Sequence, residues 1–504
     1  MKTYDLALNN IIKKIYIRGN VNYLGCLHIY QMVFSSLIFL FLPLTLGAYY
    51  ISNSKMKNLI LLIASLIFYA WGEPVYVLLM LFSTLVDYIH GLKVEKFINL
   101  GERKKALRVV ISSAIINLFV LCFFKYSDFL IENINNIFNL DIGLLNLPLP
   151  IGISFYTFQT MSYTIDIYKG DAKAQKSILD FGAYVALFPQ LVAGPIVRYQ
   201  TIATQINKRE HSIEKFADGV NRFACGLAKK VILSNQLAVI ADGVFSSNLA
   251  NISILEAWLG IICYTLQIYF DFGGYSDMAI GLGKMFGFEF LENFNYPYIS
   301  QTVSEFWRRW HISLGSWFRD YVYIPLGGSR VSKLKNYRNL FVVWFLTGMW
   351  HGASWNFIIW GLYFGLFIAL EKAFLEKLLY KVPRVFRHVY LLLIVIIGWV
   401  FFRVENIDKA FEFLKIMFGF GSNALTNNAF TVYLIDYWYI LLASIVLSTP
   451  IVKILKREVL KVNKKALDNE LAYLIQGLSL AIYMFVAIIM LCSSSYNPFL
   501  YFRF

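Results

Sequence analysis

Residues 339–370 read NLFVVWFLTGMWHGASWNFIIWGLYFGLFIAL, and this stretch decides the fold class of the chain. No residue in it carries a full charge, and a helix crosses a bilayer core in roughly 20 apolar residues. As one straight helix it would extend roughly 48 Å, which is longer than a single span. His351 lies near its middle, and ionisable groups at membrane depth are costly and usually functional.

The charges that flank this stretch predict a break within it. Lys and Arg cluster on both sides, in 308–338 and 372–387, which would place both ends in the cytoplasm. A single straight span cannot do that, so we expect an interruption near Gly348 to Asn356. Irregular backbone at membrane depth is tolerated where it lines a cavity, and His351 would lie at its lip. The alternative is that the charge rule fails here.

The composition is that of a protein that crosses a membrane many times. Of 504 residues, 58% are hydrophobic, 17% aromatic and only 15% charged. The aromatic content suits helices with interfacial belts better than the alternating strands of a barrel. Apolar runs of sufficient length predict roughly 10 to 12 transmembrane or re-entrant helices. We therefore expect an all-α polytopic membrane protein.

The formal net charge of +15 is concentrated in short connections between apolar runs. That distribution is typical of cytoplasmic loops and does not indicate a nucleic-acid partner. The five cysteines lie singly, so we expect neither a disulfide framework nor a metal site. We assign the basic segments 93–108, 198–230, 308–338, 372–387 and 453–465 to the cytoplasm, and the segments without Lys or Arg, 127–146, 245–256 and 416–432, to the outside.

The first residues differ from the rest of the chain. Residues 1–31 mix acidic and basic side chains and show no cleavage site after a short apolar core, so no cleavable signal peptide is expected. The first strong apolar run opens at Met32 and would insert uncleaved. We divide the chain into an N-terminal extension or interfacial segment, 1–31, and a membrane domain, 32–504, and leave open whether translation starts at Met1 or Met32.

Two carboxylates interrupt the apolar stretch 264–288. Asp271 and Asp277 are hard to explain by packing alone, because charged groups at membrane depth are rare. One interpretation is that they bind a substrate or a donor. The other is that each pairs locally with a basic side chain.

The next segment, 304–330, reads SEFWRRWHISLGSWFRDYVYIPLGGSR. Its arginines, histidine and tryptophans recur at helical spacing, which predicts a helix in or near the membrane interface that ends at Pro325, Gly327 and Gly328. Its arginines either contact lipid phosphates or line a cytoplasmic entrance for an anionic ligand, because guanidinium groups match phosphates. The residues of that entrance would be Arg308, Arg309, Arg319 and His311.

The histidine of the long stretch suggests acid–base chemistry. No phosphate-binding loop, nucleophile elbow, zinc-protease or dinucleotide motif occurs in the chain. A buried neutral imidazole is a good general base, and it could take the proton of a hydroxyl that attacks a thioester without any metal. Small neighbours leave room for a substrate, while Trp350 and Asn356 add bulk and a polar group. A structural histidine, and a proton-coupled transporter using Asp271, Asp277 and His351, remain alternatives.

Several motifs resemble one known family. The strings LFPQLVAGPIVRY (187–199), ENFNYPYISQTVSEFWRRWHISLGSWFRDYVYIPLGG (292–328) and GMWHGASWNFIIWG (348–361) are similar to those of membrane-bound O-acyltransferases. Within that family they resemble the bacterial alginate O-acetyltransferase branch, which is related to the D-alanyl transferase of teichoic acid modification. The likeness runs from about Met32 to Phe504.

The resemblance implies a helical ring or funnel with a thin centre in the bacterial cytoplasmic membrane. It implies that His351 is the catalytic histidine and His311 the second motif histidine. It further implies transfer of an acyl group, expected to be acetyl, from a cytoplasmic acyl-CoA or acyl carrier protein, with no bound cofactor. The acyl group would pass to an extracytoplasmic SGNH or esterase-like partner for a glycan whose identity stays open, and D-alanyl transfer is the alternative. Donor or substrate contacts are expected from Arg308, Arg309, Arg319, Asp271, Asp277, Trp350 and Asn356.

Overall fold

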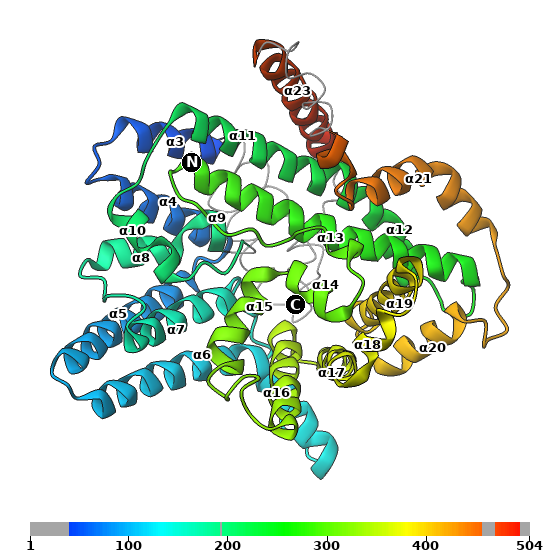
Figure 1. Ribbon diagram of the computed structural model, residues 1–504, viewed down its shortest axis with the longest axis horizontal. Helices are drawn as coiled ribbons and strands as arrows, with labels where there is room; N and C mark the ends of the chain where they lie inside the picture. The colour runs from blue at the N-terminus through cyan, green and yellow to red at the C-terminus, as the bar shows by residue number, and fades with distance from the viewer. Residues whose placement is uncertain (1–39, 192–193, 456–468, 494–504) are drawn as a thin grey trace, which may run out of the picture.

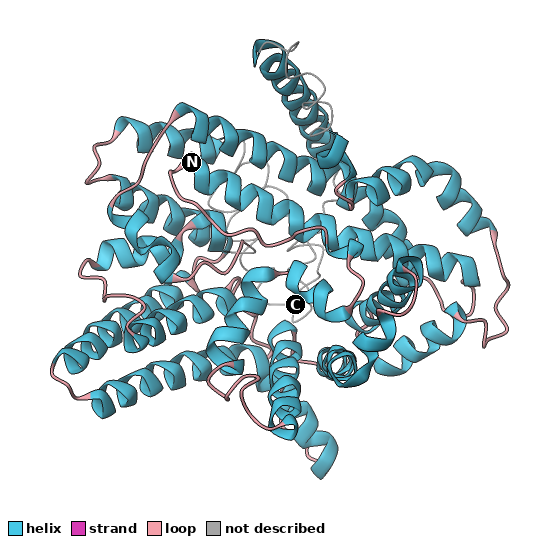
Figure 2. Cartoon of the chain, in the orientation of Figure 1, coloured by secondary structure: helices cyan, strands magenta, loops and turns pink. Residues whose placement is uncertain are grey.

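The computed structural model describes residues 40–191, 194–455 and 469–493. The segment 1–31 and the methionines at 1 and 32 lie outside these residues, so the division at 31 stays a prediction. Every regular element in the described part is a helix (Figure 2). The all-α class is therefore confirmed.

The helices fall into three consecutive groups along the chain. The first consists of α3 (Leu42–Ile51), α4 (Lys57–Gly72), α5 (Val77–Asn99), α6 (Arg103–Phe138), α7 (Ile153–Lys169), α8 (Ile178–Ala186), α9 (Phe188–Leu191) and α10 (Tyr199–Asn207). The second consists of α11 (Ile213–Ala228), η2 (Lys229–Ser234), α12 (Asn235–Ser246), α13 (Ile254–Met285), η3 (Pro297–Ile299), α14 (Val303–Arg309), α15 (Ile312–Phe318) and η4 (Arg319–Tyr323). The third consists of α16 (Lys333–His351), α17 (Trp355–Leu370), η5 (Glu371–Leu375), α18 (Glu376–Leu379), α19 (Arg384–Arg403), α20 (Ile407–Met417), α21 (Asn428–Leu447) and α23 (Asn469–Ser493).

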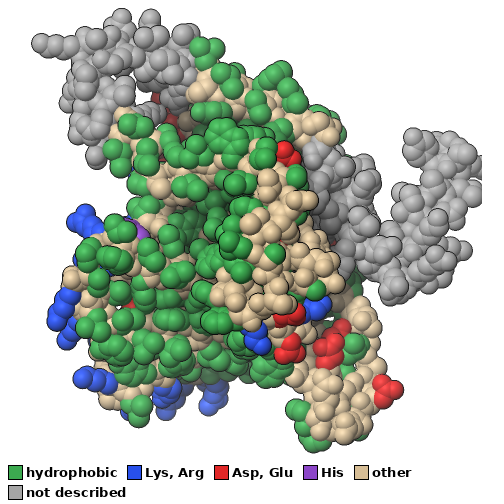
Figure 3. Space-filling model, turned by 90° about the vertical axis from the view of Figure 1, so that its right-hand side faces the viewer, with side chains coloured by type: hydrophobic (Ala, Val, Ile, Leu, Met, Phe, Trp, Pro, Cys, Tyr) green, Lys and Arg blue, Asp and Glu red, His purple; other side chains and the backbone are tan. Residues whose placement is uncertain are grey.

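The described residues contain six helices that are long and apolar enough to cross a membrane, and three shorter apolar helices. This confirms a multi-pass membrane protein, while the number of 10 to 12 spans stays a prediction. The face in Figure 3 carries a broad apolar band, with most Lys and Arg side chains on one side of it and most Asp and Glu side chains toward the other. This separation agrees with the orientation expected from the loop charges.

The helices surround a centre that holds the short helices α14 and α15. In Figure 1, α13, α16, α17 and α7 lie around this pair. Helix α13 begins with a capping box made by Ser253 and Glu256 and is buried along most of its length. Glycines on both helices allow α11 and α13 to approach closely, because a Cβ on Gly226 would lie 2.5 Å from the backbone oxygen of Gly274, and a Cβ on Gly274 would lie 2.8 Å from that of Gly226. The long helix α13 therefore supports one side of the central pair.

The long stretch that opened the sequence analysis is a helical hairpin. Helix α16 ends at His351, α17 begins at Trp355, and the residues between them are not helical. The expected break is therefore confirmed, and both flanking basic segments can lie on one side of the membrane. The two helices touch through glycine, since a Cβ on Gly348 would lie 2.3 Å from the Phe357 backbone oxygen. Small residues at this crossing make the hairpin tight.

The prediction of one continuous helix over the 304–330 segment was wrong. Helix α14 ends at Arg309, and His311 adopts left-handed backbone angles with φ of 45° before α15 begins. The preceding segment causes the interruption, because the Asn295 N–H donates to the Arg309 carbonyl and the Ile312 N–H donates to the Asn293 carbonyl. The predicted end is correct, since η4 stops at Tyr323 and turns follow.

Candidate active site

Both histidines lie where a helix is interrupted. His351 is the last residue of α16, and His311 separates α14 from α15. Their side chains are buried, with 8% and 5% of their surface exposed. The Trp350 ring lies beside both, with its centroid 5.0 Å from that of His351 and 6.1 Å from that of His311. The fold therefore brings two histidines that are forty positions apart to the same tryptophan.

Helix α6 holds the end of α16 in place. The Lys125 ammonium donates to the Trp350 carbonyl, and the Tyr126 hydroxyl donates to the Met349 carbonyl. The last carbonyls of a helix have no partner within it, and a positive charge there complements the helix dipole. These two contacts fix the backbone from which His351 projects.

The surroundings of His311 determine which ring nitrogen carries the proton. Its Nδ1 lies 3.3 Å from Asn293 Oδ1, which also accepts hydrogen bonds from the Ser313 backbone N–H at 3.0 Å and the Ser313 hydroxyl at 2.9 Å. The backbone N–H can only donate, so the Asn293 atom facing it is the oxygen. Nδ1 of His311 therefore donates to that oxygen. In the neutral ring, Nε2 then bears no proton and can accept one.

Aromatic rings surround His351. The ring centroids of Trp360 and Phe402 lie 4.9 Å and 5.1 Å from the imidazole, both close to perpendicular to it. Among the described residues, no side chain or backbone group hydrogen-bonds to the His351 ring. Within the described part of the chain, the ring is thus held by packing alone.

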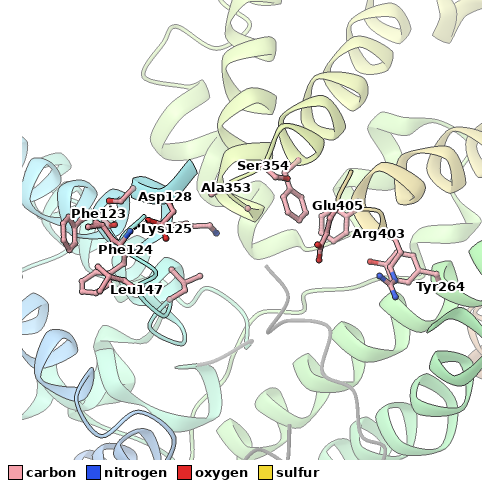
Figure 4. Close-up of a pocket in the computed structure, with 16 residues that line it drawn as sticks. Phe123, Phe124, Lys125, Asp128, Leu147, Tyr264, Ala353, Ser354, Arg403 and Glu405 are labelled. Carbon is pink, nitrogen blue, oxygen red and sulfur yellow. Dashed lines mark hydrogen bonds between the residues drawn. The ribbon is translucent and has the colours of Figure 1, made fainter. Parts of the chain in front are cut away.

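A cavity of about 370 Å³ opens beside the tip of the α16–α17 hairpin. That volume is within the range of small-molecule sites. Figure 4 shows Lys125 and Asp128 on one side of it, Ala353 and Ser354 at the hairpin tip, and Glu405 on the other side. Ser127, Asp128 and Leu145, which belong to the segment 127–146 expected outside the membrane, line the cavity. The cavity therefore opens toward the side that the loop charges assign to the outside.

His351 is adjacent to this cavity and does not line it. Gly352, the next residue, and Phe402, whose ring contacts the imidazole, both line it. The expected position at a cavity lip thus corresponds to the hairpin tip, with the histidine one residue behind it.

Comparison with known proteins identifies the family. Residues 171–407 match the family model of the membrane-bound O-acyltransferase family, MBOAT. The probable alginate O-acetylase AlgI of Pseudomonas aeruginosa is 47% identical over 404 residues, 79% of this chain and 76% of that protein. The probable alginate O-acetylase AlgI of Azotobacter vinelandii is 42% identical over 94% of this chain and 100% of that protein.

The chain belongs to the membrane-bound O-acyltransferase family. The peptidoglycan O-acetyltransferase of Helicobacter pylori is a further relative, 34% identical over 80% of this chain and 83% of that protein. The expected resemblance and the expected enzyme class, an O-acyltransferase, are therefore confirmed.

In this O-acyltransferase the two acidic residues singled out from the sequence form ion pairs. Asp271 lies 2.5 Å from the Lys230 ammonium. Asp277 lies 2.6 Å from Arg222 and 2.6 Å from Lys229. These contacts are the local pairing that the sequence left open. A role of either carboxylate in substrate binding stays a prediction.

The three arginines expected at the donor entrance also have defined environments. Arg308 is exposed, and Arg309 pairs with Glu305 at 2.9 Å. Arg319 pairs with Asp320 at 2.6 Å, and Arg198 reaches the same carboxylate at 2.6 Å. Burial raises the pKa of Asp320, but hydrogen bonds from Arg319 and Arg198 outweigh it and hold that pKa below its usual value. Arg308 thus has no carboxylate partner among the described residues, and donor binding by all three stays a prediction.

Several contacts of the site were not predicted from the sequence. The Asn356 amide donates to the Val404 carbonyl and joins the start of α17 to the end of α19. Asn293, Trp360 and Phe402, which orient or pack the two histidines, were not singled out. Asn293 lies in one of the quoted motif strings, but its contact with His311 depends on the chain reversal between them.

Proposed function

We propose that this O-acyltransferase transfers an acetyl group from a cytoplasmic thioester, acetyl-CoA, to a hydroxyl group on the other side of the cytoplasmic membrane of a bacterium. The final product would be an O-acetylated polysaccharide of the cell envelope. The observation that carries this proposal is the pair of buried histidines beside Trp350, next to a cavity that opens toward the expected outside.

The chemistry requires one base and no net change in protons. His351 would take the proton of the acceptor hydroxyl while the hydroxyl oxygen attacks the thioester carbonyl. The carbon–sulfur bond then breaks, and the thiolate leaves with the proton returned from the imidazolium. His311, whose Nε2 can accept a proton, would position the reacting groups or assist. Trp350 would separate the two histidines and shape the space between them.

The donor would approach from the basic side, where Arg308, Arg309 and Arg319 would contact the phosphates of acetyl-CoA. Asn356 would hold the hairpin tip in place against the end of α19. An extracytoplasmic esterase-like protein would receive the acetyl group at the cavity and pass it to the glycan. Membership of an enzyme family speaks against the transporter interpretation.

The relatives of Azotobacter vinelandii and Helicobacter pylori, which the chain covers over 100% and 83% of their length, are named as an O-acetylase and an O-acetyltransferase. These names support acetyl over D-alanyl as the transferred group. Labelled acetyl-CoA supplied to the purified protein in lipid tests the donor. We expect acetyl transfer or slow thioester hydrolysis, and neither with the His351→Ala variant. Turnover of a D-alanyl thioester with no turnover of acetyl-CoA would contradict the proposal.

The acceptor is tested in cells. Mass spectrometry of envelope glycans from a deletion strain should show loss of one class of O-acetyl ester, restored by the wild-type chain. An unchanged ester content across all envelope polysaccharides would contradict the proposed role.

A further inference from the structure

The last turns of α6 and the segment that follows them expose many apolar side chains that have no role in the proposed catalytic steps. We call residues 128–149 the outer ledge. Nine apolar side chains of this segment have between 37% and 70% of their surface exposed: Leu130, Ile134, Ile137, Phe138, Leu140, Ile142, Leu144, Leu145 and Leu147. Exposed apolar side chains gathered in one segment indicate an interaction site.

The outer ledge extends past the hydrocarbon core. Helix α6 begins with basic residues from Arg103 to Arg108, which we assign to the cytoplasmic surface. From Val109 to Phe138 it extends roughly 45 Å. Holding that length within a ~30 Å core would need a tilt of about 48°, and transmembrane helices tilt by at most about 40°. Lipid tails therefore do not cover the end of this helix.

The composition of the outer ledge does not suit the lipid head groups either. Helices at that depth are anchored by Trp, Tyr, Lys and Arg, and residues 127–149 contain none of these four types. The charged residues of the ledge are all acidic: Asp128, Glu132 and Asp141. An apolar surface with an acidic border matches a protein that presents apolar side chains bordered by Lys and Arg.

The outer ledge is held in a defined shape. The Asp128 carboxylate accepts the backbone N–H groups of Leu145 at 2.7 Å and Asn146 at 3.0 Å. The Asn135 side chain accepts from the Ile142 N–H at 3.0 Å and donates to the Ile142 carbonyl at 2.9 Å. The segment after α6 is thereby folded back on the helix. A preformed surface binds a partner at a lower entropic cost.

Part of the outer ledge also lines the cavity. Asp128, Leu145 and Leu147 line the cavity together with the hairpin tip. The Trp355 indole, at the start of α17, donates to Asn133 at 3.0 Å and packs against Phe129. A protein seated on the ledge would therefore cover the cavity mouth.

We infer that the outer ledge is the docking surface of an extracytoplasmic protein that presents an apolar patch with a basic border and carries the hydroxyl that receives the acyl group. The role of the hydroxyl in this inference rests on the proposed function. The place of docking rests only on the properties of the outer ledge. The acidic border accelerates and orients the encounter, and the apolar side chains hold the complex.

A photoreactive amino acid, benzoyl-phenylalanine, in place of Ile137 of the full-length protein in cells tests the inference. The matched control carries it at Phe420, which is 81% exposed in another segment expected outside. We expect Ile137 to capture one exported protein whose deletion lowers glycan acetylation at least about 10-fold, and Phe420 not to capture it. The charge-reversed variant Glu132→Lys/Asp141→Lys should lower this capture about 5-fold, because like charges then face each other.

Three results would overturn the inference: adducts to phospholipid, adducts to a second copy of this chain, or undiminished capture by the charge-reversed variant. Turnover of acetyl-CoA is measured separately on the purified protein. Absent turnover would contradict the proposed donor while the capture still locates the docking surface. Turnover that is unchanged in the charge-reversed variant, with reduced glycan acetylation, is the outcome expected if both hold.

Discussion

Ionisable side chains are buried among apolar helices at two places in this protein, with a charged partner at one place and without one among the described residues at the other. At the contact of η2 with α13, Lys230 and Asp271 lie 2.5 Å apart with side chains only 1% and 2% exposed. At the end of α16, His351 is almost as buried, but rings surround it and no described residue hydrogen-bonds to it. Burying an unpaired charge costs far more free energy than burying an unpaired neutral imidazole. The comparison separates two buried charges that neutralise each other from a buried group whose ring nitrogens no described residue hydrogen-bonds.

The largest effect should come from the histidine. Replacing His351 by Ala removes the proposed general base, so we expect acetyl transfer to fall about 1,000-fold or more. Glycan O-acetylation in cells, measured by released acetate, should vanish at unchanged protein level and membrane insertion. His351→Gln, which conserves more of the volume, should be equally inactive. Retained acetylation in either variant would remove His351 from the mechanism.

The ion pair should matter for stability. Asp271→Asn leaves the Lys230 ammonium buried without its carboxylate, so we expect a loss of about 3 kcal/mol in the free energy of unfolding. The double variant Lys230→Met/Asp271→Leu replaces both charges by apolar groups and should recover most of the lost free energy of unfolding. Thermal unfolding of the purified variants in detergent measures both. Equal stability of the single variant and the wild type would assign the pair a different role.

The hairpin crossing should give a smaller change. A methyl group at Gly348 would meet the Phe357 backbone oxygen, so Gly348→Ala should destabilise the protein by about 1–3 kcal/mol through overpacking. Gly47→Ala is the control, because no atom lies within 4 Å of its added Cβ. If the two alanine variants unfold at the same temperature, α16 and α17 do not cross at Gly348.

The smallest effect should come from the residue that positions His311. Asn293→Ala removes the acceptor that the His311 Nδ1–H shares with the Ser313 N–H and hydroxyl. The loss of the His311 bond alone corresponds to about 1 kcal/mol, or a kcat roughly 5-fold to 10-fold lower. The KM for acetyl-CoA should stay within about 2-fold, and Asn293→Asp, which keeps an accepting oxygen, should restore kcat. A fall in stability without this rescue would indicate a purely structural role.

The sequence predicted those features that depend on local pattern. Apolar runs indicated an all-α membrane protein, and the basic segments on both sides of 339–370 predicted the interruption that the hairpin shows at Gly352. The interruption at His311 was not predicted, because it depends on Asn293 and Asn295, which lie in another segment and take over the backbone hydrogen bonds there.

Features that depend on distant packing were not accessible from the sequence either. The basic partners of Asp271 and Asp277 come from α11 and η2, about 40 to 55 positions earlier. The cavity combines residues from α6, the segment that follows it, α13, the hairpin tip and the end of α19, and no local pattern relates these five segments. The family resemblance indicated the histidines, but not the asparagine and aromatic rings that hold them.

The most direct test of the central claim compares acetyl transfer by two purified variants in lipid at equal folded fraction, His351→Ala and Lys230→Met/Asp271→Leu. The account predicts that the first loses transfer from labelled acetyl-CoA altogether and that the second stays within about 5-fold of the wild type, because apolar groups can replace a buried ion pair. Transfer that persists without His351, or that disappears with the ion pair in a folded protein, would contradict it.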